Sequence, residues 1–109
     1  MTDVPLTPRL AAKLATMFPA GDCAFAAQWL VSECGPRIPG GFTDPTWVER
    51  VRAAALRLSA GSLDKLAVAT GLGQQDWRDL LMAAGFGHPD AYEAWLDEGP
   101  RDEADAANV

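Results

Sequence analysis

The chain contains 109 residues, of which 49% are hydrophobic and 22% are charged, and its formal net charge is −6. This length and composition are those of one ordinary globular domain, and no stretch resembles a flexible linker between two domains. No window approaches the ~18 consecutive apolar residues of a membrane span, and residues 1–10 lack the basic and apolar regions of a signal peptide. We therefore expect a cytoplasmic protein that does not enter a membrane.

The excess acidic charge is confined to the last fifth of the chain. Residues 1–87 contain eight basic and eight acidic side chains, whereas residues 88–109 contain one arginine and seven acidic side chains. From residue 99 onward the sequence is acidic and rich in alanine, with no large apolar side chain before Val109. Because such a segment buries little apolar surface, we predict one helical domain over residues 1–98, followed by an acidic, disordered tail over residues 99–109.

The first two predicted helices are separated by a Pro-Ala-Gly break. Thr7 followed by Pro8 is typical of a helix start, and the apolar spacing predicts a helix that continues to about Phe18. Asp22 is the expected N-cap of a second helix over residues 23–34, which is apolar nearly all round. A helix with so narrow a polar strip is usually buried, so we expect it to be the central helix of the core.

Four further helices are predicted after a loop rich in Pro and Gly at residues 35–43. No alternation of apolar and polar residues lasts long enough to indicate a strand. The Gly-Leu-Gly stretch at residues 71–73 is expected to form a tight turn. The sequence therefore predicts an all-α fold, a single compact bundle of five or six short helices. The expected ranges of the last four are 45–59, 62–70, 74–84 and 89–97.

The chain offers few residues for catalysis or metal binding. Cys23 and Cys34 both fall within the predicted second helix at a separation of ~16 Å, too far apart for a disulfide, and unpaired thiols suit a reducing compartment. We expect Cys23 to be an inert core residue. His88 is the only histidine and precedes a helix start, where a capping or solvent-exposed role is expected. Because no acid, base and nucleophile converge, we predict no enzyme, no metal site and no cofactor.

The four tryptophans each fall on the apolar face of a different predicted helix. A ligand pocket is one explanation of this pattern. The other is that four helices each contribute one large residue to a shared core, and we favour it because it requires no ligand. The residues concerned are Trp29, Trp47, Trp77 and Trp95.

The segment at residues 62–84 begins Ser-Leu-Asp-Lys-Leu-Ala-Val-Ala-Thr-Gly-Leu-Gly-Gln-Gln-Asp-Trp-Arg-Asp-Leu-Leu-Met. Its small Ala67 permits close helix crossing, Gly71 lies four residues later at the expected turn, and Leu72 follows to fill the hairpin. This pattern resembles a helix-turn-helix. Any close-packed helical hairpin favours the same small and apolar positions, so the resemblance predicts a helix-turn-helix-like hairpin with or without DNA binding.

The resemblance implies a recognition surface on the second helix of the pair, residues 74–84, which enters the major groove in DNA-binding members of the group. The acidic Asp76 and Asp79 outnumber Arg78 there, which is unfavourable beside phosphates. We therefore expect a protein partner on this surface, with sequence-specific DNA binding as the alternative. The outward residues that form the candidate interaction surface are Gln74, Gln75, Arg78, Asp79 and Met82.

The predicted function is a non-catalytic protein-interaction module, a small regulatory, adaptor or inhibitor-type protein. Arg50 and Arg57 on the helix at 45–59 form a candidate basic face. The acidic tail is expected either to fold back over that face or to remain solvated. Phe42 and Phe86 are expected either to form a homodimer patch or to cover the core.

Overall fold

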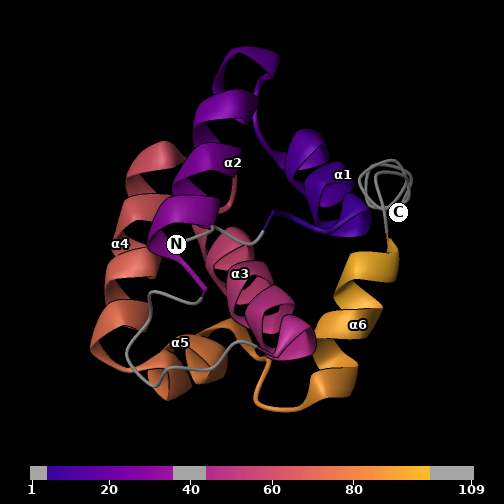
Figure 1. Cartoon of the computed structure of the whole chain (residues 1–109), viewed down its shortest axis with the longest axis vertical. Helices are drawn as coiled ribbons and strands as arrows, with labels where there is room; N and C mark the ends of the chain where they lie inside the picture. The colour runs from indigo at the N-terminus through magenta and orange to yellow at the C-terminus, as the bar shows by residue number, and fades with distance from the viewer. Residues whose placement is uncertain (1–4, 36–43, 99–109) are drawn as a thin grey trace, which may run out of the picture.

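The computed structural model describes residues 5–35 and 44–98, and within them it confirms the all-α prediction. These residues form six helices and no strand (Figure 1). The predicted acidic tail at 99–109 and Phe42 in the predicted loop lie outside the described residues. The helices are α1 (Pro8–Met17), α2 (Ala20–Glu33), α3 (Pro45–Ser59), α4 (Leu63–Gln75), α5 (Trp77–Ala84) and α6 (Pro89–Glu98).

Side-chain caps start three of these helices where the sequence predicts them. Thr7, Asp44 and Ser62 each accept a hydrogen bond from the backbone N–H three residues further on, at 3.3, 2.9 and 3.3 Å. Each cap satisfies one of the free N–H groups of the first helical turn. Gly85 ends α5 with a φ of 79°, a left-handed conformation that glycine adopts without a steric penalty.

The start of α2 differs from the prediction. Pro19 is the N-cap of this helix, and Asp22 lies within its first turn rather than before it. Proline holds its own φ near the helical value, so a helix begins readily beside it. Asp22 still places its negative charge near the free N–H groups at the start of the helix, where it is favourable.

The prediction that the second helix is the central one is wrong, because α3 occupies the middle of the bundle (Figure 1). Nine of the fifteen residues of α3 are buried, whereas in α2 only Ala26 and Leu30 are, and Phe25 is 57% exposed. The three alanines at 53–55 are all fully buried, and their small side chains allow neighbouring helices to approach α3 from several sides. A helix that is apolar all round is thus not necessarily the most buried one.

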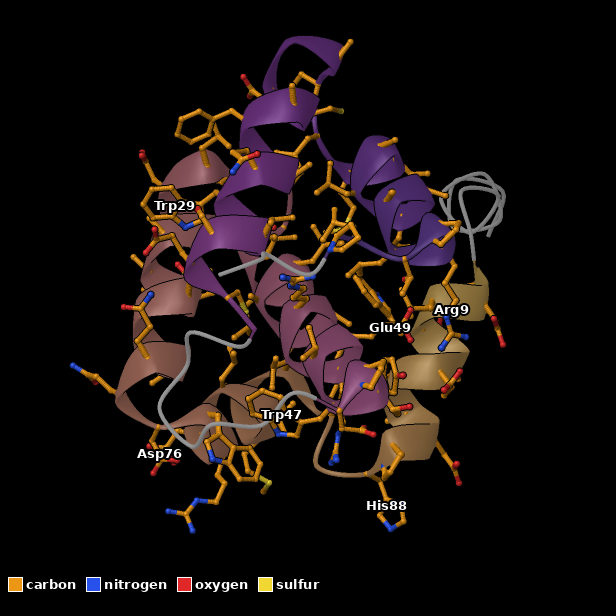
Figure 2. All side chains as sticks on the ribbon, in the orientation of Figure 1. Arg9, Trp29, Trp47, Glu49, Asp76 and His88 are labelled. Carbon is orange, nitrogen blue, oxygen red and sulfur yellow. The ribbon has the colours of Figure 1, made fainter. Side chains whose placement is uncertain are left out.

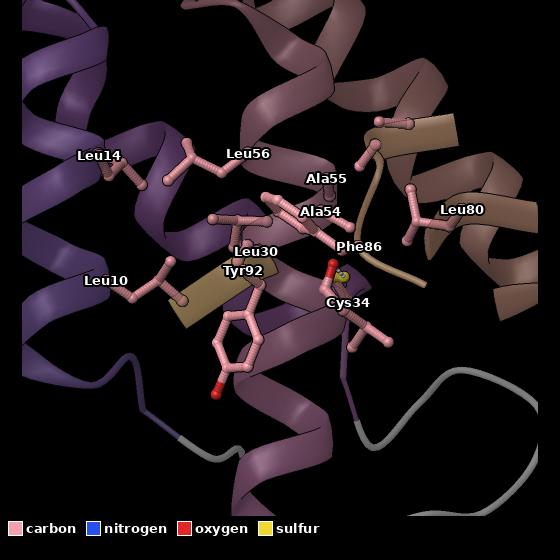
Figure 3. Close-up of a cluster of buried hydrophobic side chains, with 14 of the residues drawn as sticks. Leu10, Leu14, Leu30, Cys34, Ala54, Ala55, Leu56, Leu80, Phe86 and Tyr92 are labelled. Carbon is pink, nitrogen blue, oxygen red and sulfur yellow. Dashed lines mark hydrogen bonds between the residues drawn. The ribbon is translucent and has the colours of Figure 1, made fainter. Parts of the chain in front are cut away.

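Side chains from the surrounding helices gather around α3 to form the core (Figure 3). Phe86, in the turn between α5 and α6, is fully buried, so it covers the core and does not form a surface dimer patch. Its ring lies 6.3 Å from that of Tyr92 and 5.6 Å from that of Trp95, both on α6. The buried side chains labelled in the figure include Leu10, Leu14, Leu30, Ala54, Leu56, Leu80 and Tyr92.

The four tryptophans lie on four different helices and contribute to one core, as expected: Trp95 belongs to the buried cluster, and Trp29, Trp47 and Trp77 are partly buried and pack against it. Trp95 is buried beside Phe86, whereas Trp47 and Trp77 meet edge to face with ring centroids 5.7 Å apart. Trp29 of α2 faces α4 instead, where its indole N–H donates a 2.9 Å hydrogen bond to Thr70.

The predicted turn at residues 71–73 is absent, because α4 continues through both glycines to Gln75. Gly71 does not adopt a positive φ, and Gly73 is buried within the helix. Asp76 is the single residue between α4 and α5. Its backbone N–H donates the last hydrogen bond of α4 to the carbonyl of Leu72, at 2.9 Å. Its side chain caps α5 by accepting a hydrogen bond from the backbone N–H of Arg78, at 3.0 Å. The two helices therefore form a hairpin, but they meet at Asp76 and not at the predicted turn over residues 71–73.

Candidate functional site

A hollow of about 360 Å³ opens beside α5 and is the candidate functional site. Four of the residues that line it lie on α5, one comes from α3, and one from the turn between α5 and α6. We call it the α5 hollow. Its lining residues are Arg50, Trp77, Arg78, Leu81, Met82 and Gly87.

All five residues of the predicted interaction surface are exposed, but they do not lie on one helix. The break at Asp76 leaves Gln74 and Gln75 at the end of α4, so the predicted helix at 74–84 is wrong in its first three residues. Gln74 donates to the Glu33 backbone carbonyl at 2.9 Å and to its side chain at 3.2 Å, which ties α4 to α2. Of the five predicted residues, only Arg78 and Met82 line the α5 hollow.

The apolar part of the hollow is held in place by the edge-to-face pair of Trp47 and Trp77, whose rings are inclined at 78°. Met82 is 71% exposed, which makes it one of the most exposed large apolar residues in the described part of the chain. Leu81, next to it, is buried. The hollow thus combines the exposed thioether of Met82 with Trp77, whose ring packs against Trp47, and with the buried Leu81.

Arg78 forms the outer cationic edge of the hollow. Its Nε lies 3.4 Å from Asp76 Oδ1, its guanidinium lies 5.9 Å from the centre of the Trp77 ring, and its side chain is 73% exposed. The hydrogen bond from the Arg78 backbone N–H, together with the guanidinium, lowers the pKa of the Asp76 carboxyl below its ordinary value. Asp76, which is labelled in Figure 2, therefore stays charged to lower pH than an ordinary aspartate and keeps its capping role there.

Arg50 and Arg57, the predicted basic face, both contact the turn between α5 and α6. Arg50 donates from Nε to the carbonyl of Phe86 at 3.0 Å and from Nη2 to the carbonyl of Gly87. The Arg57 guanidinium lies 5.1 Å from the centre of the Phe86 ring. Arg50 also lines the α5 hollow, whereas Arg57 does not. Whether the acidic tail covers this face stays a prediction, since residues 99–109 lie outside the described ones.

The histidine and the two cysteines are not among the residues that line the α5 hollow. His88 is exposed, and its backbone carbonyl accepts from Ala91 at the start of α6 (Figure 2). Both cysteines are free thiols: Cys23 is half-buried, and Cys34 is fully enclosed. Burial raises the pKa of the Cys34 thiol to about 12, which leaves it protonated and unreactive at neutral pH. In residues 5–35 and 44–98 no three His, Cys, Asp or Glu side chains are grouped as a metal site.

A polar cluster that the sequence did not reveal joins α1, α3 and α6 (Figure 2). Glu49, buried on α3, accepts from Arg9 at 2.6 Å, from the Tyr92 hydroxyl at 2.8 Å, and from the Thr7 hydroxyl. Burial alone would raise the pKa of Glu49, but these hydrogen bonds and the Arg9 charge lower it. A hydrogen bond from Arg9 likewise lowers the pKa of Glu93. The only sequence signal was an acidic residue beside the apolar stripe of α3.

A second hollow, of about 310 Å³, lies between α2 and α4. Phe25 and Trp29 line it with their rings stacked at a centroid separation of 6.1 Å. Val68, on α4, is 73% exposed. This face carries apolar surface but no cation among the residues that line the hollow, so it differs in character from the α5 hollow.

None of the helices in the described ranges has the combined length and apolar character of a membrane span. The chain matches no protein-family model, and no curated protein or solved structure is significantly similar to it. Only the residues and the structure of this chain therefore bear on its function.

Proposed function

We propose that this chain is a non-catalytic protein-interaction module whose contact surface is the α5 hollow. The observation that carries the proposal is Met82, 71% exposed at a concave surface lined also by Trp77 and Leu81. Exposed apolar groups beside a preformed concavity are typical of binding sites, because an anchoring side chain of a partner removes both surfaces from water. Methionine is well suited to such contacts because its unbranched side chain adapts to the shape of a partner.

The charges around α5 favour a protein over DNA as the partner. DNA affinity depends largely on neutralising phosphates with lysine and arginine. The start of α5 instead presents Asp76 as its N-cap and Asp79 in its first turn, and the one cation of α5, Arg78, is paired with Asp76. The glutamines that would read adenine edges belong to α4, and Gln74 is hydrogen-bonded to Glu33. The alternative, a DNA-binding regulator, therefore has less support.

A photo-crosslinking amino acid at position 82, introduced in the native host, tests this proposal. The matched control carries the same group at Ala94, an exposed position on α6 that does not line the hollow. We expect a discrete protein adduct from position 82 and none from position 94. A nuclease-sensitive adduct from position 82 would support the DNA-binding alternative. Identical adducts from both positions, or none from either, would contradict a contact surface at α5.

A further inference from the structure

We infer that the partner segment that enters the α5 hollow carries a carboxylate beside a large apolar side chain; this inference rests on the proposed function. The hollow is lined by the apolar residues Trp77, Leu81 and Met82 and by two cationic residues, Arg50 and Arg78. An occupant that matches both parts must be apolar at one point and negatively charged next to it.

The positive charge of Arg50 is not neutralised by a carboxylate in the described part of the chain. The ion pairs formed there join Arg9 to Glu49 and Glu93, and Arg78 to Asp76. Arg50 donates instead to the backbone carbonyls of Phe86 and Gly87, which satisfy N–H groups but carry no net charge. Those bonds also hold the guanidinium in place, so little side-chain entropy is lost when an anion approaches it.

The ion pair of Arg78 is weak enough to be exchanged. Its single Nε–Oδ1 separation from Asp76 is 3.4 Å, and the arginine side chain is 73% exposed. Exposed pairs of this kind contribute little to stability, because water screens the attraction between the two charges. Asp76 also accepts from the backbone N–H of Arg78, and it keeps this bond if the guanidinium turns toward an occupant. The cost of transferring Arg78 to a partner carboxylate is therefore small.

The size and surroundings of the hollow favour a short acidic and apolar peptide over a nucleic acid. Its volume of about 360 Å³ lies near the lower limit of ligand pockets, which suits an anchoring side chain. A phosphate strand would carry negative charge past Asp76 and Asp79, both close to Arg78 in the sequence. It would also gain nothing from Leu81 and Met82. A peptide places one or two carboxylates at the arginines and buries its apolar residue against the wall.

A peptide-display selection on the purified full chain tests the inference. A random twelve-residue library is selected on the wild-type chain and depleted on Met82→Asp, which changes a side chain that is 71% exposed and outside the core. We expect the enriched peptides to contain Asp or Glu within a few residues of Leu, Phe or Trp. Enriched peptides without acidic residues would overturn this inference and leave the interaction module standing. Selection that does not distinguish Met82→Asp from the wild type would count against the α5 hollow as a binding surface.

Charge reversal provides the second measurement, with a synthetic peptide from the selection. Arg78→Glu should weaken its binding about tenfold or more, measured by fluorescence anisotropy at physiological salt. The matched control is Lys65→Glu, which makes the same change of net charge at an exposed position of α4 outside the hollow. We expect the control to alter affinity by less than about threefold. Equal losses in the two variants would show that only net charge matters, and the assigned role of Arg78 would be wrong.

Discussion

The Arg9 guanidinium on α1 donates two hydrogen bonds to the Glu49 carboxylate on α3, from Nη2 to Oε1 at 2.6 Å and from Nε to Oε2 at 3.1 Å. The hydroxyl of Tyr92 on α6 donates to the same carboxylate at 2.8 Å. One buried carboxylate therefore joins three helices. Because bidentate arginine–carboxylate pairs are geometrically specific, this cluster sets how α1 and α6 pack against α3.

Removing the charge of Glu49 should destabilise the fold. In Glu49→Gln the charge-assisted bonds from Arg9 and Tyr92 are lost or weakened, at a cost of about 2–3 kcal/mol. Urea denaturation at pH 7 measures the free energy of unfolding. The matched control is Glu93→Gln: its side chain is 42% exposed, and its pairing with Arg9 should be worth about 1 kcal/mol or less. Equal effects of the two substitutions would contradict the structural role of Glu49.

The same carboxylate should make stability depend on acid pH. Hydrogen bonding lowers the pKa of Glu49 in the folded state, whereas the unfolded chain titrates near ~4.3. The unfolded state therefore binds the proton first, so the contribution of Glu49 is present above that pH and is lost as the pH falls through the lowered folded-state pKa. Denaturation midpoints between pH 7 and pH 3 should fall more steeply for the wild type than for Glu49→Gln. Parallel curves would show that other groups control acid unfolding.

Arg52 should be essential for stability although it carries a charge in the core. It is 1% exposed and donates to the backbone carbonyl of Cys34 at 2.8 Å and to those of Val31 and Pro5 at 3.3 Å. Arg52→Met leaves these carbonyls without that donor and should cost about 3 kcal/mol or more. The control, Arg57→Met, removes an exposed cation over Phe86 and should cost about 1 kcal/mol or less in thermal or urea unfolding. A mild effect of Arg52→Met would mean that water replaces its bonds.

Two glycine substitutions should act in opposite directions. Gly71 lies within α4 with open space around an added Cβ, so Gly71→Ala should stabilise the fold by about 0.5–1 kcal/mol. Gly61 has a φ of +83°, and a Cβ there would collide with the carbonyl oxygen of Met17, so Gly61→Ala should cost about 2–4 kcal/mol. Thermal unfolding of both variants decides the point. Destabilisation by Gly71→Ala would indicate that a turn, and not a helix, occupies that position.

The two thiols should differ in reactivity. Cys34 is fully buried, donates to the Val51 carbonyl at 3.7 Å, and has a pKa raised to about 12, whereas Cys23 is half-buried. At pH 8 a disulfide reagent should modify Cys23 in the native protein and Cys34 only after denaturant is added. The variant Cys23→Ser isolates the second thiol. Rapid modification of that variant without denaturant would show that the core around Cys34 opens readily.

Sequence reasoning succeeded where local chemistry decides the outcome. The helix starts at Thr7, Asp44 and Ser62 depend on a side chain capping the N–H groups that follow it, so the signal lies within four residues. The stop at Gly85 depends equally on one residue that accepts a positive φ. The exposure of Met82 was predicted correctly from helical spacing, although the first residue of its helix was not.

The helix-turn-helix interpretation was wrong in its junction because glycine permits a turn without requiring one. The hydrogen bond from Trp29 to Thr70 holds α4 against α2, and burial of Gly73 makes a helical course favourable through the glycines. Trp29 and Thr70 lie 41 residues apart in the sequence, so no local pattern reveals their contact. The shift of the junction to Asp76 moved Gln74 and Gln75 out of the candidate site.

By itself, the sequence determined that this protein is helical, where most of its helices begin and end, and which side chains of α5 face outward. Those properties follow from capping chemistry and from the 3.6-residue period of the helix, which act over a few residues. Only the tertiary structure decided that α3 is central, that Arg9 and Tyr92 meet at Glu49, and that Arg50 joins Arg78 at one hollow. Each of these depends on how helices distant in sequence pack, and many packings satisfy the same apolar pattern.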